Sequence, residues 1–162
     1  MARVTASPPP AILPLDSARH PFELFVLVWG LVVTLPLLVG APAPGSTTAL
    51  LGPGLARVWA FILAGGCLVA LVGAWWTWWA WLGRRFPRVR PSLITGLLVE
   101  MVGLVAVGVG ASIYVYGVLD QAGLAASVPA GIVGGFGLAC WWRSGQIYRW
   151  VVATISALES HR

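Results

Sequence analysis

Charged residues are scarce in this sequence, and lysine is absent altogether. Only 9% of the 162 residues are charged, whereas 59% are hydrophobic and the mean hydropathy is +0.87. A soluble domain usually carries about a quarter charged residues. This composition excludes an ordinary soluble domain and predicts an integral membrane protein, in which each helical crossing takes about 20 apolar residues.

Residues that perform chemistry are equally sparse. The two cysteines, Cys67 and Cys140, have no Cys-x-x-Cys spacing and no histidine close in sequence, and His20 and His161 lie outside the apolar runs. No Ser-His-Asp arrangement or metalloprotease motif appears, and "GIVGGFG" at 131–137 lacks the Lys-Ser/Thr of a phosphate-binding loop. We therefore expect no catalytic residues, no metal site and no cofactor, and we expect that the protein is not an enzyme.

The apolar runs predict an all-α fold, an integral membrane bundle of four transmembrane helices with short loops. The expected crossings are residues about 21–40, 58–82, 92–118 and 122–142. A turn-rich loop, "GAPAPGSTTALLGPG", separates the first two crossings. Because Pro129 and several glycines weaken the fourth run, its full crossing is left open.

Two segments flank this transmembrane domain, which comprises residues 21–142. Residues 1–20 form a Pro-rich leader, expected in the cytoplasm. Residues 143–162 form an amphipathic helical tail, with Ile147, Trp150 and Val151 among its apolar positions. The tail either extends the fourth helix into the cytoplasm or lies in the membrane interface.

The arginines predict the orientation. With four crossings, nine of the ten arginines fall on the side that holds both termini, and only Arg57 falls on the other. The positive-inside rule then places the N- and C-termini in the cytoplasm of a multi-pass protein of the cell (inner or plasma) membrane. The net charge of +5 is assigned to topology and lipid rather than to nucleic acid.

Tryptophan is concentrated at the expected cytoplasmic boundary. Five tryptophans in seven residues are followed by four arginines, and a second cluster ends the fourth run. Indole rings favour the membrane interface, where arginines meet anionic headgroups. We expect interfacial positions for Trp75, Trp76, Trp78, Trp79, Trp81, Arg84, Arg85, Arg88, Arg90, Trp141, Trp142 and Arg143. A more specific lipid-headgroup or partner site is the alternative.

Glu100 lies deep in the third apolar run, where an unpaired acid costs on the order of 3 kcal/mol. It shares a helical stripe with Gly96, Gly103, Gly110 and Gly117, and small residues let another helix approach closely. We therefore expect Glu100 to face a neighbouring helix and either to fix the packing of the bundle or to couple to protons. The donors expected at matching depth are Thr77, Trp75, Trp76, Trp78 and a snorkelling Arg84.

The stretches "HPFELFVLVWGLVVTLPLLVGAPAPGS" and "SLITGLLVEMVGLVAVGVGASIYVYGV" resemble small multi-helix membrane proteins encoded by actinobacterial phages and prophages. The likeness covers most of the chain from His20 to Gln146 and includes the Leu-Leu-Val-Glu around Glu100. That family has no established activity, so the resemblance implies a membrane location and no mechanism.

The sequence thus predicts a non-enzymatic membrane protein that associates with itself or with another membrane protein through the glycine stripe of the third helix. A holin-like pore former is the first alternative, although four crossings exceed the one to three typical of holins. A small proton-coupled transporter that uses Glu100 is the second.

Overall fold

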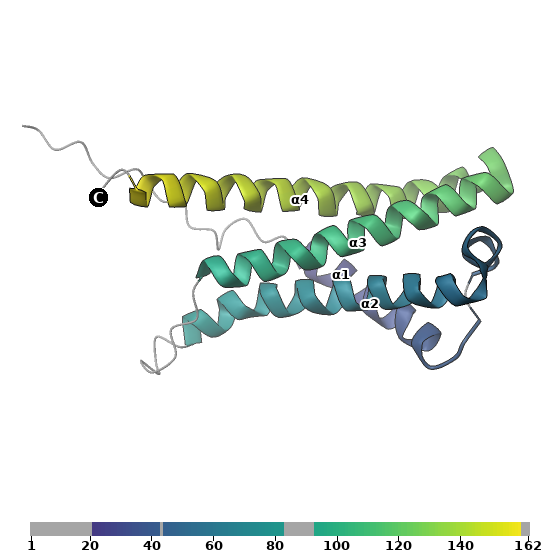
Figure 1. Ribbon diagram of the computed structural model, residues 1–162, viewed down its shortest axis with the longest axis horizontal. Coiled ribbons are helices and arrows are strands. Elements are labelled where there is room, and N and C mark those ends of the chain that lie inside the picture. Colours follow the sequence, from purple (N-terminus) through teal and green to yellow (C-terminus); the bar gives the residue numbers. More distant parts are fainter. Residues whose placement is uncertain (1–20, 43, 83–92, 160–162) are drawn as a thin grey trace, which may run out of the picture.

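The computed structural model describes residues 21–42, 44–82 and 93–159. These residues form the helices α1 (Pro21–Leu38), α2 (Gly45–Leu82), α3 (Leu93–Ala122) and α4 (Ser127–Glu159), with a short 3-10 helix, η3 (Gly123–Ala126), between α3 and α4 (Figure 1). The described part of the chain contains no strand, which confirms the expected all-α fold for these residues.

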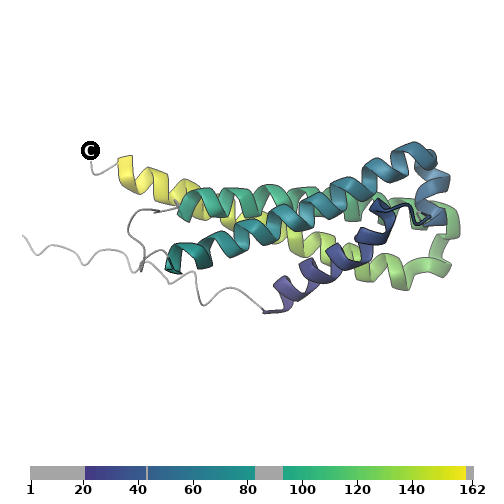
Figure 2. The same ribbon diagram turned by 90° about the horizontal axis from the view of Figure 1, so that it is seen from below.

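The long helices lie side by side. α3 packs against both α2 and α4, and the chain reverses between α3 and α4 at η3, so that these two helices form an antiparallel pair (Figure 1). The shorter α1 crosses α2 obliquely (Figure 2). Its backbone lies close to that of α2 and apart from those of α3 and α4, which only its side chains reach. One side of the bundle, between α1 and α4, is therefore loosely closed.

The loop expected between the first two crossings is shorter than predicted. α2 begins at Gly45, so most of the segment expected to be a loop is helical. Only a kink at Gly52, with φ of 74° and ψ of 166°, interrupts α2, and Pro53 follows it. A proline in this position starts a new helical segment without loss of a hydrogen bond, because its missing N–H is not needed in a first turn. The turn-forming residues bend the helix here rather than end it.

The helix that contains the fourth expected crossing does not end at Trp142. α4 continues without a break to Glu159, so residues 143–159 extend the fourth helix. A helical extension is what the first of the two alternatives for the tail predicted. Gly123, with φ of 56°, makes the turn before it, and Pro129 falls within the first turn, where proline is tolerated. Ile147 and Val151 on the extension are buried against the bundle.

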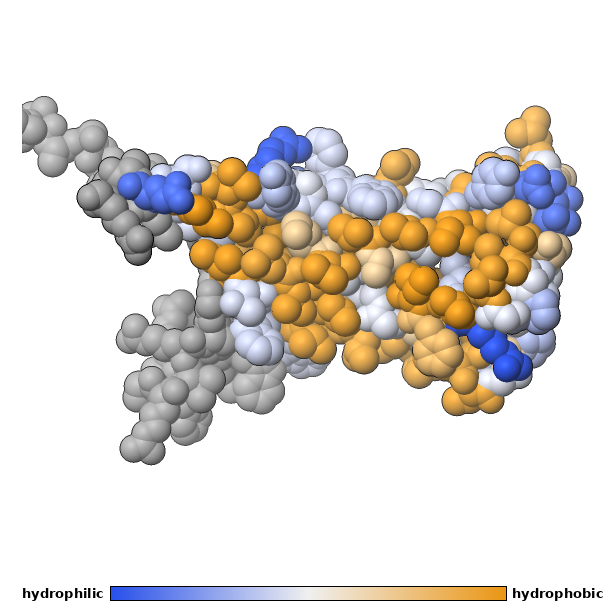
Figure 3. Space-filling view, viewed as in Figure 1, coloured by the Kyte–Doolittle hydropathy of each residue, from blue (hydrophilic) through white to orange (hydrophobic). Residues whose placement is uncertain are grey.

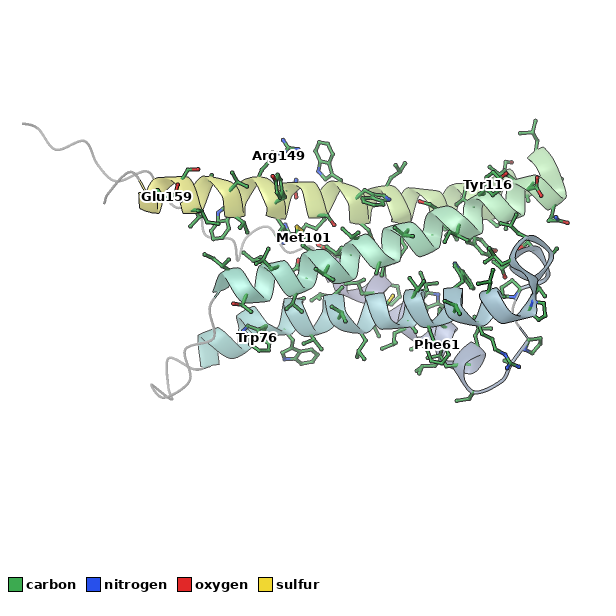
Figure 4. The ribbon with its side chains drawn as sticks, in the orientation of Figure 1. Phe61, Trp76, Met101, Tyr116, Arg149 and Glu159 are labelled. Carbon is green, nitrogen blue, oxygen red and sulfur yellow. The ribbon has the colours of Figure 1, made fainter. Side chains whose placement is uncertain are left out.

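Two helical stretches are long and apolar enough to cross a membrane, Gly45–Trp76 and Ile94–Ser156, and the second includes the reversal at η3. Small side chains occupy much of the interior of the described part, among them Ala56, Ala60, Ala64, Cys67, Ala70 and Ala74. Large apolar side chains face outward instead, such as Phe61 at 59% exposure (Figure 4). The visible surface is accordingly hydrophobic along its middle, with hydrophilic residues gathered toward its ends (Figure 3).

Candidate functional site

The glycine stripe of α3 faces α2 of the same chain. A Cβ added at Gly103 would overlap the backbone of Ala70, and one at Gly110 would lie 2.8 Å from Cδ1 of Leu63. Both ends of the stripe also contact α2: Gly96 lies against Trp76 and Gly117 against Leu50. The close approach expected from small residues is therefore made within the chain, and this stripe is already covered by α2.

Two glycines of α2 complete this contact from the other side. A Cβ at Gly73 would overlap the backbone of Glu100, and one at Gly66 would lie 3.0 Å from the backbone nitrogen of Val107. Glu100 is consequently held where α2 and α3 are closest. Its side chain turns toward α4, because it pairs there with Arg143.

Three charged side chains, those of Glu23, Glu100 and Arg143, meet in an ionic cluster. Nε and Nη2 of Arg143 each donate to Oε1 of Glu100 at 3.4 Å, and Nε lies 3.6 Å from Oε1 of Glu23. Glu100 is 2% exposed and Arg143 is 9% exposed. Because the three residues come from α3, α4 and α1, the cluster joins three helices, including the loosely attached α1.

The sequence interpretation gave Arg143 only an interfacial role, whereas the structure buries its side chain against Glu100. Arg143 was also absent from the donors expected for Glu100. The reason is the register of α3 against α4, which brings residues separated by 43 positions together. An uninterrupted α4 puts Arg143 near the middle of a helix instead of at its end. One sequence signal could have identified the Glu100–Arg143 pair. The helical periodicity of the fourth apolar run continues past Arg143, which places this arginine inside the helix.

The other interfacial residues are described in part. Trp75 and Trp76 on α2 are 55% and 36% exposed, and Trp141 and Trp142 on α4 also face outward. The side chains of Trp78, Trp79 and Trp81 and the whole of Arg84, Arg85, Arg88 and Arg90 lie outside the described residues. The same holds for the side chain of Thr77, an expected donor to Glu100.

A second cation, Arg149, lies on the outer side of α4 (Figure 4). Its guanidinium carbon lies 6.0 Å from the ring centroid of Trp142, at the outer limit of a cation–π contact. Arg149 therefore remains at the surface, whereas Arg143 on the same helix is drawn into the bundle.

A cavity opens between α1 and α4 beside the ionic cluster. Its volume is about 950 Å³, at the upper end of the range for small-molecule sites. Glu23, Arg143 and Gln146 supply its polar groups, and the remaining wall is mainly apolar, with Val26, Leu27, Leu104, Phe136, Leu138, Ala139 and Trp142 among its residues.

A second cavity, of about 350 Å³, adjoins the first, because Val26 and Phe136 line both. It reaches toward the opposite end of α1, where Thr34, Trp59 and Tyr114 form part of its wall. Trp59 is fixed there by a hydrogen bond from its Nε1 to the carbonyl oxygen of Gly110 at 2.8 Å and by stacking on Tyr114. The two cavities share the wall residues Val26 and Phe136, and we call the pair the α1–α4 groove; its polar groups lie at the end that holds Glu23 and Arg143.

The described residues include no group of three metal-ligating side chains. Cys67 and Cys140 are both buried and free within this part of the chain. Comparison with protein families, with curated proteins and with solved structures found no match to this chain. The resemblance to phage-encoded membrane proteins thus stays a prediction.

Proposed function

We propose that this protein is a non-enzymatic, multi-pass membrane protein in which α1, α2, α3 and α4 each cross the bilayer and both termini lie in the cytoplasm. The observation that carries the proposal is the distribution of side-chain size. Alanine, glycine and cysteine make up much of the contact between helices, whereas many of the large apolar side chains, such as Phe25, Trp29 and Val32, face outward. Small residues at helix contacts and large apolar residues on the outer surface suit a protein surrounded by lipid. In lipid the hydrophobic effect does not drive helices together, so close packing of small residues has to hold them.

The surface through which the protein associates with a partner is expected at a different place from the glycine stripe of α3. Because α2 covers the glycine stripe, a second copy or another membrane component has to bind elsewhere. The α1–α4 groove is the favoured place, because the backbone of α1 lies close to that of α2 only and a cavity separates it from α4. The proposed function is therefore binding within the membrane at this groove, with the α2–α3 pair as its rigid support.

Topology is tested with single cysteines in the full chain. Gln121→Cys, exposed in the last turn of α3, is expected to react from outside intact cells with a membrane-impermeant maleimide. Ser156→Cys, exposed near the end of α4, is expected to react only after the cells are opened. The native cysteines are buried, so the parent chain serves as the unreactive control. Reaction of both variants from outside would contradict a crossing of the membrane by α4, which is the one helix between the two positions.

Proton-coupled transport is a second candidate, favoured by a carboxylate that is buried among apolar helices and lies next to a cavity wall. Glu100 shares Arg143 with Glu23, so loss or gain of one proton changes the charge of the whole cluster. This candidate predicts pH-driven substrate movement in proteoliposomes that is abolished in Glu100→Gln. Loss of movement with unchanged folding would support transport, whereas intact movement would remove this candidate.

A further inference from the structure

Arg143 keeps donors that the ionic cluster does not use. Its Nε and Nη2 nitrogens contact the two carboxylates, and Nη1 has no acceptor among the described residues. Among the described residues, every side-chain nitrogen or oxygen that is fully buried has a hydrogen-bond partner. Because Nη1 has no such partner, it is not fully buried and can be reached from the cavity. Arg143 lines the larger cavity, and Gln146 presents a further amide one turn along α4. Two donors therefore stand at the polar end of the α1–α4 groove.

A carboxylate lies beside these donors. Glu23 lines the same cavity, and its side chain is 27% exposed although it pairs with Arg143. A carboxylate has about four acceptor positions, so a carboxylate that already has contacts within the protein can still accept from a ligand where it lines a cavity. The polar end of the groove thus holds opposite charges side by side, and Glu23 disfavours a ligand that is purely anionic.

We infer that the α1–α4 groove binds a zwitterionic phospholipid whose headgroup has a phosphate and a primary ammonium, as in phosphatidylethanolamine. The phosphate accepts hydrogen bonds from Nη1 of Arg143 and from Gln146, and the ammonium donates to Glu23. Guanidinium N–H groups match phosphate geometry, and hydrogen bonds between charged groups are the strong ones. The inference rests on the proposed membrane location.

The apolar part of the groove suits the acyl chain. Beyond the ionic cluster the wall consists of Val26, Leu104 and Phe136, and the groove continues to Trp29, Leu63 and Ile132 in the adjoining cavity. Glu23 belongs to the first turn of α1, so the polar end lies near one end of this helix. A headgroup at that end and a chain along α1 follow the orientation of lipids in a bilayer.

The test uses the full-length protein in nanodiscs that contain equal amounts of phosphatidylethanolamine and phosphatidylglycerol. After gentle extraction, native mass spectrometry counts the lipid that remains bound. The wild type is expected to retain phosphatidylethanolamine over phosphatidylglycerol by about tenfold, the factor of one charge-assisted hydrogen bond. Glu23→Gln is expected to lose this preference, because the charge that selects the ammonium is gone. Gln146→Leu is expected to lower retention of both lipids and to keep the preference.

Gly135→Leu fills the groove, because Gly135 lines the larger cavity and a Cβ there meets no atom within 4 Å. It is expected to abolish retention. Gly131→Leu is the matched control on the same helix, since Gly131 is exposed and unobstructed and lies outside both cavities. A wild type without lipid preference, or a Glu23→Gln variant that keeps it, would overturn the inference.

Two other outcomes have distinct meanings. A wild-type dimer that Gly135→Leu converts to a monomer would assign the groove to a second copy and overturn the lipid inference. Failure of the protein to enter bilayers at all would overturn the proposed function as well, whereas insertion with no lipid preference would remove the lipid inference alone.

Discussion

Arg143 on α4 donates from Nε and Nη2 to a single oxygen of Glu100 on α3, both at 3.4 Å. The pair lies in the interior, with side-chain exposures of 11% for Arg143 and 3% for Glu100. Two buried charges are costly to desolvate, so the value of this contact depends on both partners being present. Each partner removed alone leaves the other without its main compensation.

The first prediction concerns removal of one partner. Arg143→Met is expected to lower the free energy of unfolding by roughly 3–5 kcal/mol, because it leaves the Glu100 carboxylate buried without its guanidinium. The double variant Glu100→Met, Arg143→Met is expected to recover most of that loss, since an apolar pair of similar volume needs no desolvation of charge. Stability is measured by reversible unfolding in mixed detergent micelles. Arg149→Met is the control, because Arg149 is exposed.

Equal losses in the single and double variants would show that Arg143 stabilises the bundle through packing of its alkyl chain. Recovery in the double variant would instead assign the loss to the unpaired charge. The comparison therefore separates the charge of Arg143 from its volume.

The sequence predicted the helical class and the character of the faces because both depend on local spacing. The glycine repeat of α3 follows from a seven-residue period, and the structure places all four glycines against α2. The partner of Glu100 depends on the register between α3 and α4, which no local pattern contains. The kink at Gly52 was missed for a related reason: the same glycine and proline signals mark both loops and bends.

The second prediction concerns the α2–α3 contact. Gly103→Ala is expected to destabilise the bundle by several kcal/mol, because the new methyl group meets the backbone of Ala70 and cannot be relieved by a change of rotamer. Gly65→Ala, on the exposed face of α2, is expected to be neutral or to stabilise by at most about 1 kcal/mol through helix propensity. Thermal unfolding of both variants in the same detergent checks the difference. Similar behaviour of the two variants would contradict the backbone contact.

The third prediction concerns Trp59. Trp59→Phe keeps an aromatic ring against Tyr114 but removes the donor to the carbonyl oxygen of Gly110. We expect a loss of about 1 kcal/mol in the free energy of unfolding, which is the net contribution of one hydrogen bond. Trp29→Phe is the matched substitution, because Trp29 is 59% exposed and stacks on Phe25 outside the interior. A larger effect at Trp29 than at Trp59 would show that the hydrogen bond is not the stabilising contact.

The last prediction concerns the bend in α2. Gly52 has φ of 74° and ψ of 166°, a region that residues with a Cβ enter at a cost of roughly 1–3 kcal/mol. Gly52→Ala is therefore expected either to lose about that much stability or to straighten the helix at this point. Gly54→Ala, two residues later, has an ordinary backbone conformation and open space at its Cβ, so it is expected to gain a little stability from helix propensity. Unfolding measurements distinguish the two variants, and spin labels at Ala49 and Phe61 report any change of distance across the bend. Because both substitutions add one methyl group to the same helix, a difference between them isolates the left-handed backbone of Gly52. Equal stability together with an unchanged distance would contradict a bend that depends on glycine.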